Sequence, residues 1–304
     1  MPTAEYTKLL YPKFGIKEYH DEGNFGQRTS IYIIDTGLTN TPNSLANVHN
    51  RNITNPMARK NTHGSFVASI IAQKPGGGHS GIAPQAEIYL ADVSNEDGVI
   101  YTSSLVKAIR DAVDLKVDII SISLGTDVYD QHLEDVVKLA QKKNILVVAA
   151  SGNCGCRTYE FPSSCDSAIS VASMDQNRLP SSFNTRNDAV AVFAPGQNLK
   201  VPGSDSRLSG TSFAVPFASG LLALELSRRR QSNPKSFMGR EEAISVLRVA
   251  LGLDCGLHTY ANDVCSGKFS GGAFGPPHGS DGLKWFLIIS VLGAAVAFYC
   301  NSKF

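Results

Sequence analysis

The sequence predicts an α/β fold, a three-layer, doubly wound and mostly parallel sheet with helices on both faces, followed by a C-terminal hydrophobic helix. Short apolar runs alternate with helix-like segments along most of the chain. The runs are continuous rather than alternating, which is typical of strands covered on both faces. With 304 residues, 42% of them hydrophobic, the chain is long enough to build one large core.

Apolar runs rich in β-branched residues are predicted as the strands of this sheet. They lie at 30–37, 86–93, 118–125, 144–153, 168–174 and 189–196. Between several of them, segments 102–115 and 130–142 place apolar residues three and four apart behind a Thr or an Asp, which predicts capped helices. Strands that alternate with helices in this way predict right-handed crossovers between parallel strands. The active site of such a sheet is expected beyond the carboxyl ends of its strands.

Charge and cysteine content restrict the class of protein. The formal net charge of +1 argues against nucleic acid as a partner. Six cysteines are too few for a disulfide scaffold at this length. Three of them cluster as Cys154, Cys156 and Cys165. A metal site, a disulfide and free thiols all remain open for this cluster.

Polar side chains of four kinds stand where the predicted strands end and the helices begin. Asp35 ends the first run and Asn153 ends the fourth, while His63 opens segment 62–73 and Ser212 opens a long apolar helix. A serine hydroxyl becomes a strong nucleophile when an imidazole takes its proton and a carboxylate orients that imidazole. An amide donor and the start of a helix both stabilise the oxyanion that follows. The four residues therefore predict acyl-transfer chemistry.

The motifs around these residues resemble those of a subtilisin-like serine protease, a subtilase. They occur in the family's order and cover roughly residues 15–265. The matching stretches are IIDTGL, THGSFVASIIA, GIAPQAEIYLADV, SISLG, VVAASGN, FAPG and LSGTSFAVPFASG. The chain departs from the family's pattern at Ser69, Phe213 and Phe217, which stand where Gly, Met and His are usual.

The resemblance implies a serine endopeptidase that forms an acyl-enzyme on protein or peptide substrates. By the same resemblance, Ser212 is the nucleophile, His63 the general base and then acid, Asp35 the orienting carboxylate and Asn153 the oxyanion donor. No cofactor is required, and a structural calcium ion is compatible with the family. An extended substrate would pair with Ser123, Leu124 and Gly125. The opposite wall of the primary specificity pocket would be formed by Ala150, Ser151 and Gly152.

Glu160 precedes Phe161-Pro162, which matches a Tyr-Pro pair of the family's pattern. The resemblance places this residue on the floor of the primary specificity pocket, where a carboxylate would favour Lys or Arg. The alternative is a surface Glu, since the loop between Asn153 and Phe161 is shortened relative to the family.

Two other functions fit part of the sequence. An aspartic protease also carries an Asp-Thr-Gly loop, but it needs a second such loop or a dimer, and no second Asp-Thr-Gly or Asp-Ser-Gly occurs in the chain. A catalytically silent, membrane-anchored binding module would keep the same fold. Retention of Asp35, His63, Asn153 and Ser212 argues against it.

The ends of the chain suggest further segments. Residues 1–14 form an N-terminal extension that leaves no room for a folded prodomain, and 8–14 could act as a short inhibitory peptide. Residues 15–265 form the catalytic domain and 266–283 a Gly/Pro-rich linker.

Residues 284–301 are predicted as a single-pass membrane anchor because 285–300 carry no charge. Gly293 and Ala297 have a spacing that would let two such helices form a homodimer. A helix packed on the domain is the alternative. The flanking Lys284 and Lys303 do not decide which side the domain faces, and the missing signal peptide favours the cytosol.

Overall fold

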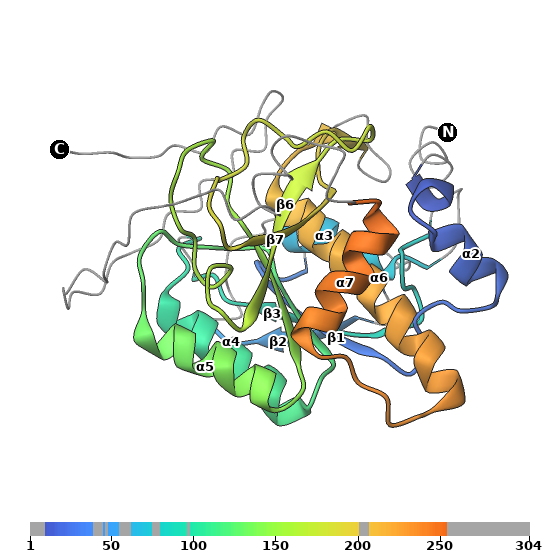
Figure 1. Cartoon of the computed structure of the whole chain (residues 1–304). Helices are drawn as coiled ribbons and strands as arrows, with labels where there is room; N and C mark the ends of the chain where they lie inside the picture. The colour runs from blue at the N-terminus through green and yellow to red at the C-terminus, as the bar shows by residue number, and fades with distance from the viewer. Residues whose placement is uncertain are drawn as a thin grey trace.

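Seven strands form the central sheet of the molecule, which is drawn in Figure 1. Their order is β2-β3-β1-β4-β5-β6-β7, and every neighbouring pair is parallel. The computed structural model describes residues 10–38, 45, 48–54, 62–74, 80–95, 98–200 and 207–253. The strands are β1 (Ser30–Asp35), β2 (Val48–Asn52), β3 (Glu87–Asp92), β4 (Ile119–Ile122), β5 (Leu146–Ala150), β6 (Ala168–Met174) and β7 (Val190–Pro195). A separate antiparallel pair joins β8 (Leu199–Lys200) to β9 (Arg207–Leu208).

Six of the seven sheet strands lie within the predicted apolar runs, so the parallel α/β prediction is confirmed for them. Strand β2 is not among the predicted strands, and its residues VHNRN are half-buried or exposed. This strand stands at the edge of the sheet and pairs only with β3. An exposed edge strand carries no continuous apolar run, so hydrophobic patterning gives no sign of it.

Helices cover both faces of the sheet, as the alternation of side chains along the strands requires. Ile31 and Ile33 face one hydrophobic cluster and Tyr32 and Ile34 face the other. The first cluster packs against α2 (Ile16–Asp21), α3 (His63–Ala72), α6 (Thr211–Ser232) and α7 (Arg240–Leu251). The second packs against α4 (Thr102–Leu115) and α5 (Gln131–Lys142). The described chain therefore has the predicted three layers.

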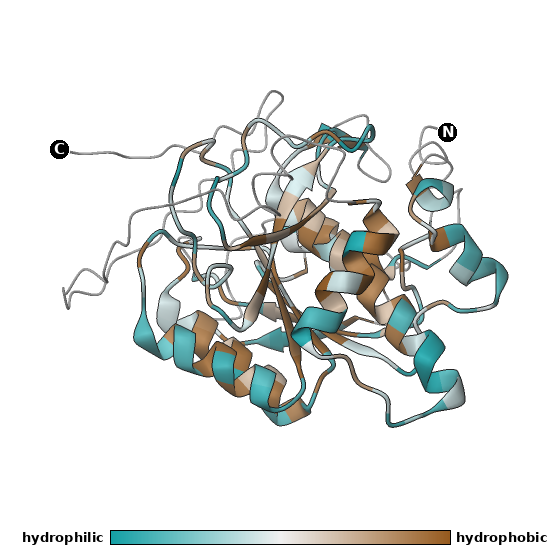
Figure 2. Ribbon diagram, viewed as in Figure 1, coloured by the Kyte–Doolittle hydropathy of each residue, from teal (hydrophilic) through white to brown (hydrophobic). Residues whose placement is uncertain are grey.

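The two predicted helices behind a Thr or an Asp begin differently. At α5, Oδ1 of Asp130 accepts hydrogen bonds from the amides of His132 and Leu133 at 2.8 and 3.1 Å, so this cap is confirmed. At α4, Thr102 is already the first helical residue and Tyr101 holds the N-cap position without a side-chain hydrogen bond. Figure 2 shows hydrophilic residues along the outer side of α5, while α6 is hydrophobic over most of its length.

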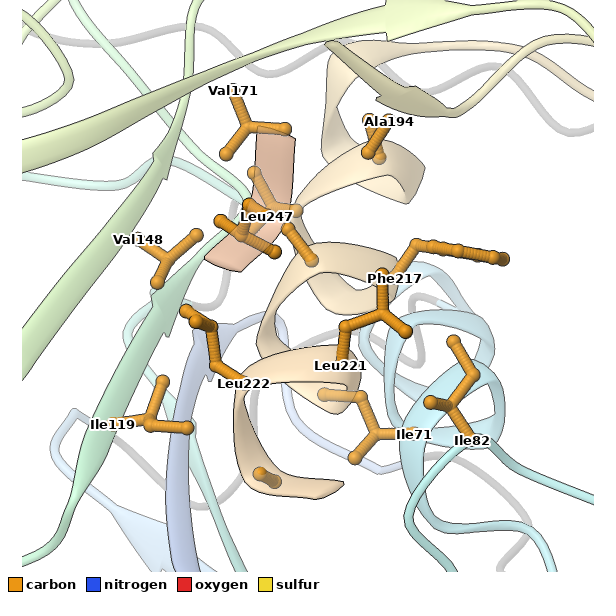
Figure 3. Packing of buried hydrophobic residues seen from close by; sticks show 14 of the residues in the cluster. Ile71, Ile82, Ile119, Val148, Val171, Ala194, Phe217, Leu221, Leu222 and Leu247 are labelled. Carbon is orange, nitrogen blue, oxygen red and sulfur yellow. The ribbon is translucent and has the colours of Figure 1, made fainter. Parts of the chain in front are cut away.

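Helix α6 is the central helix of the first cluster, and each of its residues from Thr211 to Ser227 is buried. Phe217 and Leu221 lie beside Ile71 and Ile82, as Figure 3 shows. On the neighbouring side of the helix, Leu222 lies toward the sheet residues Ile119 and Val148 (Figure 3). Burial on all sides fixes the position of the first turn of α6, where Ser212 stands.

The described residues of the N-terminal extension also belong to this core. Leu10, Tyr11 and Phe14 are buried in the first cluster. The ring of Phe14 meets that of Phe217 edge-on at 5.5 Å, and the guanidinium of Arg178 lies 5.3 Å from the centre of the Phe14 ring. Residues 10–14 therefore pack against α6 and are not available as the inhibitory peptide that the sequence suggested.

Replacing Phe14 by Ala is expected to destabilise the folded protein by about 3–5 kcal/mol, the usual cost of removing a fully buried aromatic ring. The side chain is 0% exposed, and the change would leave a cavity against Phe217. Denaturant unfolding of the two proteins measures the difference. Lys17→Ala is the matched control, since Lys17 forms an exposed ion pair with Asp21 and should cost under about 1 kcal/mol. Equal stability of Phe14→Ala and the parent protein would contradict the packing.

The predicted linker 266–283 and the predicted hydrophobic helix 284–301 lie outside the described residues. Within the described ranges, no helix is both long and apolar enough to cross a membrane.

Candidate active site

Asp35 and His63 meet at the carboxyl end of the central strand. Asp35 is the last residue of β1 and fully buried, and His63 is the first residue of α3. The Nδ1 atom of His63 lies 2.8 Å from Oδ1 and 3.0 Å from Oδ2 of Asp35. With Nδ1–H donating to the carboxylate, Nε2 keeps its lone pair and can accept a proton.

Two small residues, Thr36 and Gly64, allow His63 to come this close to Asp35. The amide of Thr36 donates to Oδ1 of Asp35 at 2.7 Å, and the hydroxyl of Thr36 accepts from the amide of Gly64 at 3.2 Å. A Cβ atom at Gly64 would lie 2.4 Å from the carbonyl oxygen of Gly37, so any larger residue would push α3 away from β1. Thr36 and Gly64 therefore fix the carboxylate and the helix that carries the imidazole.

Ser212 is the second residue of α6 and is 7% exposed. Phe213, its neighbour, places its ring 5.3 Å from the His63 ring, so the hydroxyl and the imidazole share one end of the sheet. Phe213 therefore packs on the imidazole from the position where the family usually has Met.

Pro216 explains a further contact of Ser212. A proline has no amide hydrogen, so it cannot donate to the carbonyl four residues earlier, which is that of Ser212. The hydroxyl of Ser123 donates to this carbonyl at 2.8 Å instead. Ser123 follows β4 directly, and its hydrogen bond ties segment 123–125 to the turn that carries Ser212.

Asn153 stands three residues beyond β5, next to the start of α6. Its Oδ1 accepts from the amide and the hydroxyl of Thr211 at 2.8 and 3.1 Å. Because backbone amides only donate, the contact with Thr211 assigns the oxygen of the Asn153 side chain. The NH₂ group is therefore left to donate elsewhere. Sequence reasoning missed Thr211, since a Thr at a helix start usually signals nothing beyond a cap.

Segment 123–125 follows β4 directly, and segment 150–152 begins at the last residue of β5. Because β4 and β5 are paired, the two segments lie beside one another. Among their residues, Ser123, Leu124, Ala150 and Ser151 are buried, while Gly125 and Gly152 are half-buried.

Glu160 lies between the two glycines of these segments. Its Oε2 is 3.2 Å from where a Cβ atom of Gly125 would stand, and its Cγ is 2.5 Å from the corresponding point at Gly152. The structure thus brings Glu160 to both segments. Burial, and after it the charge of Asp127, raises the pKa of Glu160 to about 7.

The cysteine cluster is divided between two environments. Cys154 and Cys156 form a disulfide next to Asn153, with a Cα–Cα distance of 5.1 Å. Cys165 is a free, buried thiol, and burial raises its pKa, so it stays protonated and unreactive. Among the residues that the structure describes, no group of three or more His, Cys, Asp or Glu side chains could hold a metal ion.

Comparison with known proteins identifies the family. The sequence model of the Subtilase family matches residues 26–248. The chain is 33% identical to the major intracellular serine protease of Bacillus subtilis (strain 168) over 252 residues, which cover 77% of this chain and 79% of that protein. It is 32% identical to subtilisin BL of Lederbergia lenta over 71% of this chain and 81% of that protein.

Solved structures agree with the sequence matches. The prenylagaramide maturation protease PagA superimposes with a TM-score of 0.66 at 30% identity, over 77% of this chain and 86% of PagA. The protease domain of PatA gives a TM-score of 0.65 at 27% identity, over 80% of this chain and 98% of that domain. The parallel sheet, its flanking helices and these matches together show that the chain belongs to the subtilase family of serine endopeptidases.

Proposed function

We propose that this serine endopeptidase cleaves peptide bonds with Ser212 as nucleophile, His63 as general base and acid, Asp35 as the orienting carboxylate and Asn153 as oxyanion donor. The contact between His63 Nδ1 and the buried Asp35 carboxylate is the observation that carries the proposal. It fixes the tautomer in which Nε2 accepts a proton, and it stabilises the imidazolium that results.

In the first half of the reaction, Nε2 of His63 takes the proton of Ser212 as Oγ attacks the peptide carbonyl carbon. The carbonyl oxygen becomes an oxyanion, and the NH₂ group of Asn153 donates to it. The imidazolium then gives its proton to the leaving nitrogen as the C–N bond breaks. This step releases the amine fragment and leaves an ester between Ser212 and the acyl fragment.

In the second half, His63 takes a proton from water, whose oxygen attacks the ester carbonyl. The imidazolium returns this proton to Oγ of Ser212 as the ester bond breaks. The acid fragment leaves, and the enzyme is restored. Every proton transfer in the proposed cycle uses this chain's own side chains.

The segments beside the nucleophile are proposed to hold the substrate. An extended peptide would add as a strand along 123–125, so main-chain hydrogen bonds would supply affinity for any sequence. Residues 150–152 would form the opposite wall of the primary specificity pocket, and Glu160 its floor. The distances from Glu160 to the positions of Gly125 and Gly152 support this arrangement.

Covalent labelling with a serine-reactive fluorophosphonate tests the assignment. The parent protein should be labelled at Ser212, and prior labelling should abolish peptide hydrolysis. Peptide mapping by mass spectrometry identifies the modified residue. A label on another serine, or none on a folded parent protein, would overturn the proposed site.

We further propose, from the uncharged run 285–300, that residues 284–301 tether the protein to a membrane and that Gly293 and Ala297 allow the tethered chains to pair. The full-length chain should sediment with membranes and resist extraction by high salt. A chain that lacks residues 284–304 should be active in the supernatant. Full-length protein found only in the supernatant, or a truncated chain that does not fold, would count against the tether.

A further inference from the structure

Glu160 has a second carboxylate beside it that the sequence analysis did not identify. Thr126 and Phe161 form an antiparallel bridge, in which the amide of Thr126 donates to the carbonyl of Phe161 at 2.9 Å and the return hydrogen bond measures 2.6 Å. In such a bridge the residue after one member lies opposite the residue before the other. Asp127 therefore lies across from Glu160, and its charge acts on the Glu160 carboxyl.

Nothing within the described part of the chain neutralises these two acids. The side chain of Glu160 is half-buried, makes no ion pair and accepts no hydrogen bond there, and Asp127 is exposed. Of the neighbouring segments, 150–152 carries no titratable side chain and Thr185, which also lies against Gly152, is uncharged. Asp127 is thus the one charged group among the described residues that acts on Glu160.

A half-buried carboxylate without a partner favours the binding of a cation. Because residues 125 and 152 are glycines, neither position places a Cβ atom against the Glu160 side chain. A long cationic side chain could reach the carboxylate between these segments and pair with its charge. An apolar side chain would displace water from the carboxylate and offer no group that stabilises the charge.

We infer that Glu160 and Asp127 select substrates with Arg or Lys at the residue whose carbonyl is attacked, and that this selection switches on as the pH rises through neutrality. The inference rests on the proposed function, because it takes 123–125 and 150–152 as the walls of the primary specificity pocket. It adds the chemical class of the substrate and a control by pH.

The direction of the pH dependence follows from the raised pKa of Glu160, about 7. Below that pH the carboxyl is protonated and neutral, so a cationic substrate gains little over a neutral one. Above it the carboxylate is charged and the preference is fully present. Repulsion from Asp127 contributes to the raised pKa, so removing that charge should move the transition to lower pH.

Two peptides that differ only in Arg or citrulline at the selected position test the inference, because citrulline keeps the shape of Arg without its charge. The measured quantity is the ratio of their kcat/KM values between about pH 5.5 and 9. Any effect of pH that acts on both substrates alike cancels in this ratio. For the parent enzyme the ratio should rise about ten- to a hundred-fold across neutrality, the range for a hydrogen bond to a charged group.

Variants separate the contributions of the two acids. Glu160→Gln should lower the ratio toward unity and remove its rise across neutrality. Asp127→Asn should keep the preference for Arg but shift its midpoint to lower pH. Asp114→Asn, which removes an exposed charge on α4, is the matched control and should behave like the parent protein.

Two results would overturn the inference in different ways. A parent enzyme that is labelled at Ser212 but cleaves both peptides equally well at every pH would refute the role of Glu160 and Asp127 and leave the proposed function intact. A folded parent enzyme that is not labelled and cleaves neither peptide would refute the proposed function and the inference together.

Discussion

Ser212→Ala is expected to lower kcat by about a million-fold, the magnitude measured for the catalytic serine of the related subtilisin. The variant keeps the backbone carbonyl that accepts from Ser123, so the first turn of α6 should stay in place. The melting temperature should therefore match that of the parent protein. Turnover of a fluorogenic peptide by the two purified proteins measures the loss.

Ser227→Ala is the matched control for this variant. Ser227 is a buried serine of the same helix, and its hydroxyl has no hydrogen-bond partner among the described residues. It lies about 22 Å along the helix from Ser212, at 1.5 Å per residue. Full activity is expected of this control. If Ser212→Ala kept turnover within tenfold of the parent protein, Ser212 would not be the nucleophile.

Asn153→Ala is expected to lower kcat by about a hundred- to a thousand-fold with little change in KM, again the range measured for the oxyanion-hole asparagine of subtilisin. The side-chain oxygen of Asn153 is engaged by Thr211, so its NH₂ group is the part that can stabilise the oxyanion. The alanine variant loses a donor that matters only when negative charge develops on the substrate. Steady-state kinetics at saturating substrate measure the fall in kcat.

Thr211 provides a graded control for Asn153. Thr211→Ser keeps both donors to Oδ1 of Asn153 and should retain most activity. Thr211→Val removes the hydroxyl but keeps the backbone amide, so a smaller loss of kcat than in Asn153→Ala is expected. A large rise in KM with unchanged kcat in Asn153→Ala would instead show that this side chain binds the ground state.

Much of the fold could be predicted because most strands are buried on both faces. Ile31 to Ile34 are each 0% exposed, and such a run leaves a clear signal in the sequence. The edge strand β2 left no such signal, because its residues are half-buried or exposed. Helix α7 was missed although its buried residues Ala243, Ile244, Leu247 and Leu251 have helical spacing.

The candidate site also has one part that the sequence could predict and one part that it could not. Asp35, His63, Asn153 and Ser212 stand at strand ends and helix starts, where residue type and motif suffice to single them out. The bond from Thr211 to Asn153 links residues 58 apart in sequence, and the bridge that sets Asp127 beside Glu160 links residues 35 apart. Such contacts depend on how separate segments meet, so no local pattern predicts them.

The parallel sheet also determines how the chain must fold. Strand β1 is central, and Ile31 pairs with Ile88 on one side and with Ile119 on the other. Neither neighbour can be reached through a tight hairpin, because a parallel pair needs a long crossover. These contacts join residues far apart in the sequence, so the contact order is high. Closing such long loops costs conformational entropy before the contacts form, so folding is expected to be slow. Until β1 acquires both neighbours its unpaired edges favour aggregation, so refolding yields should fall as protein concentration rises.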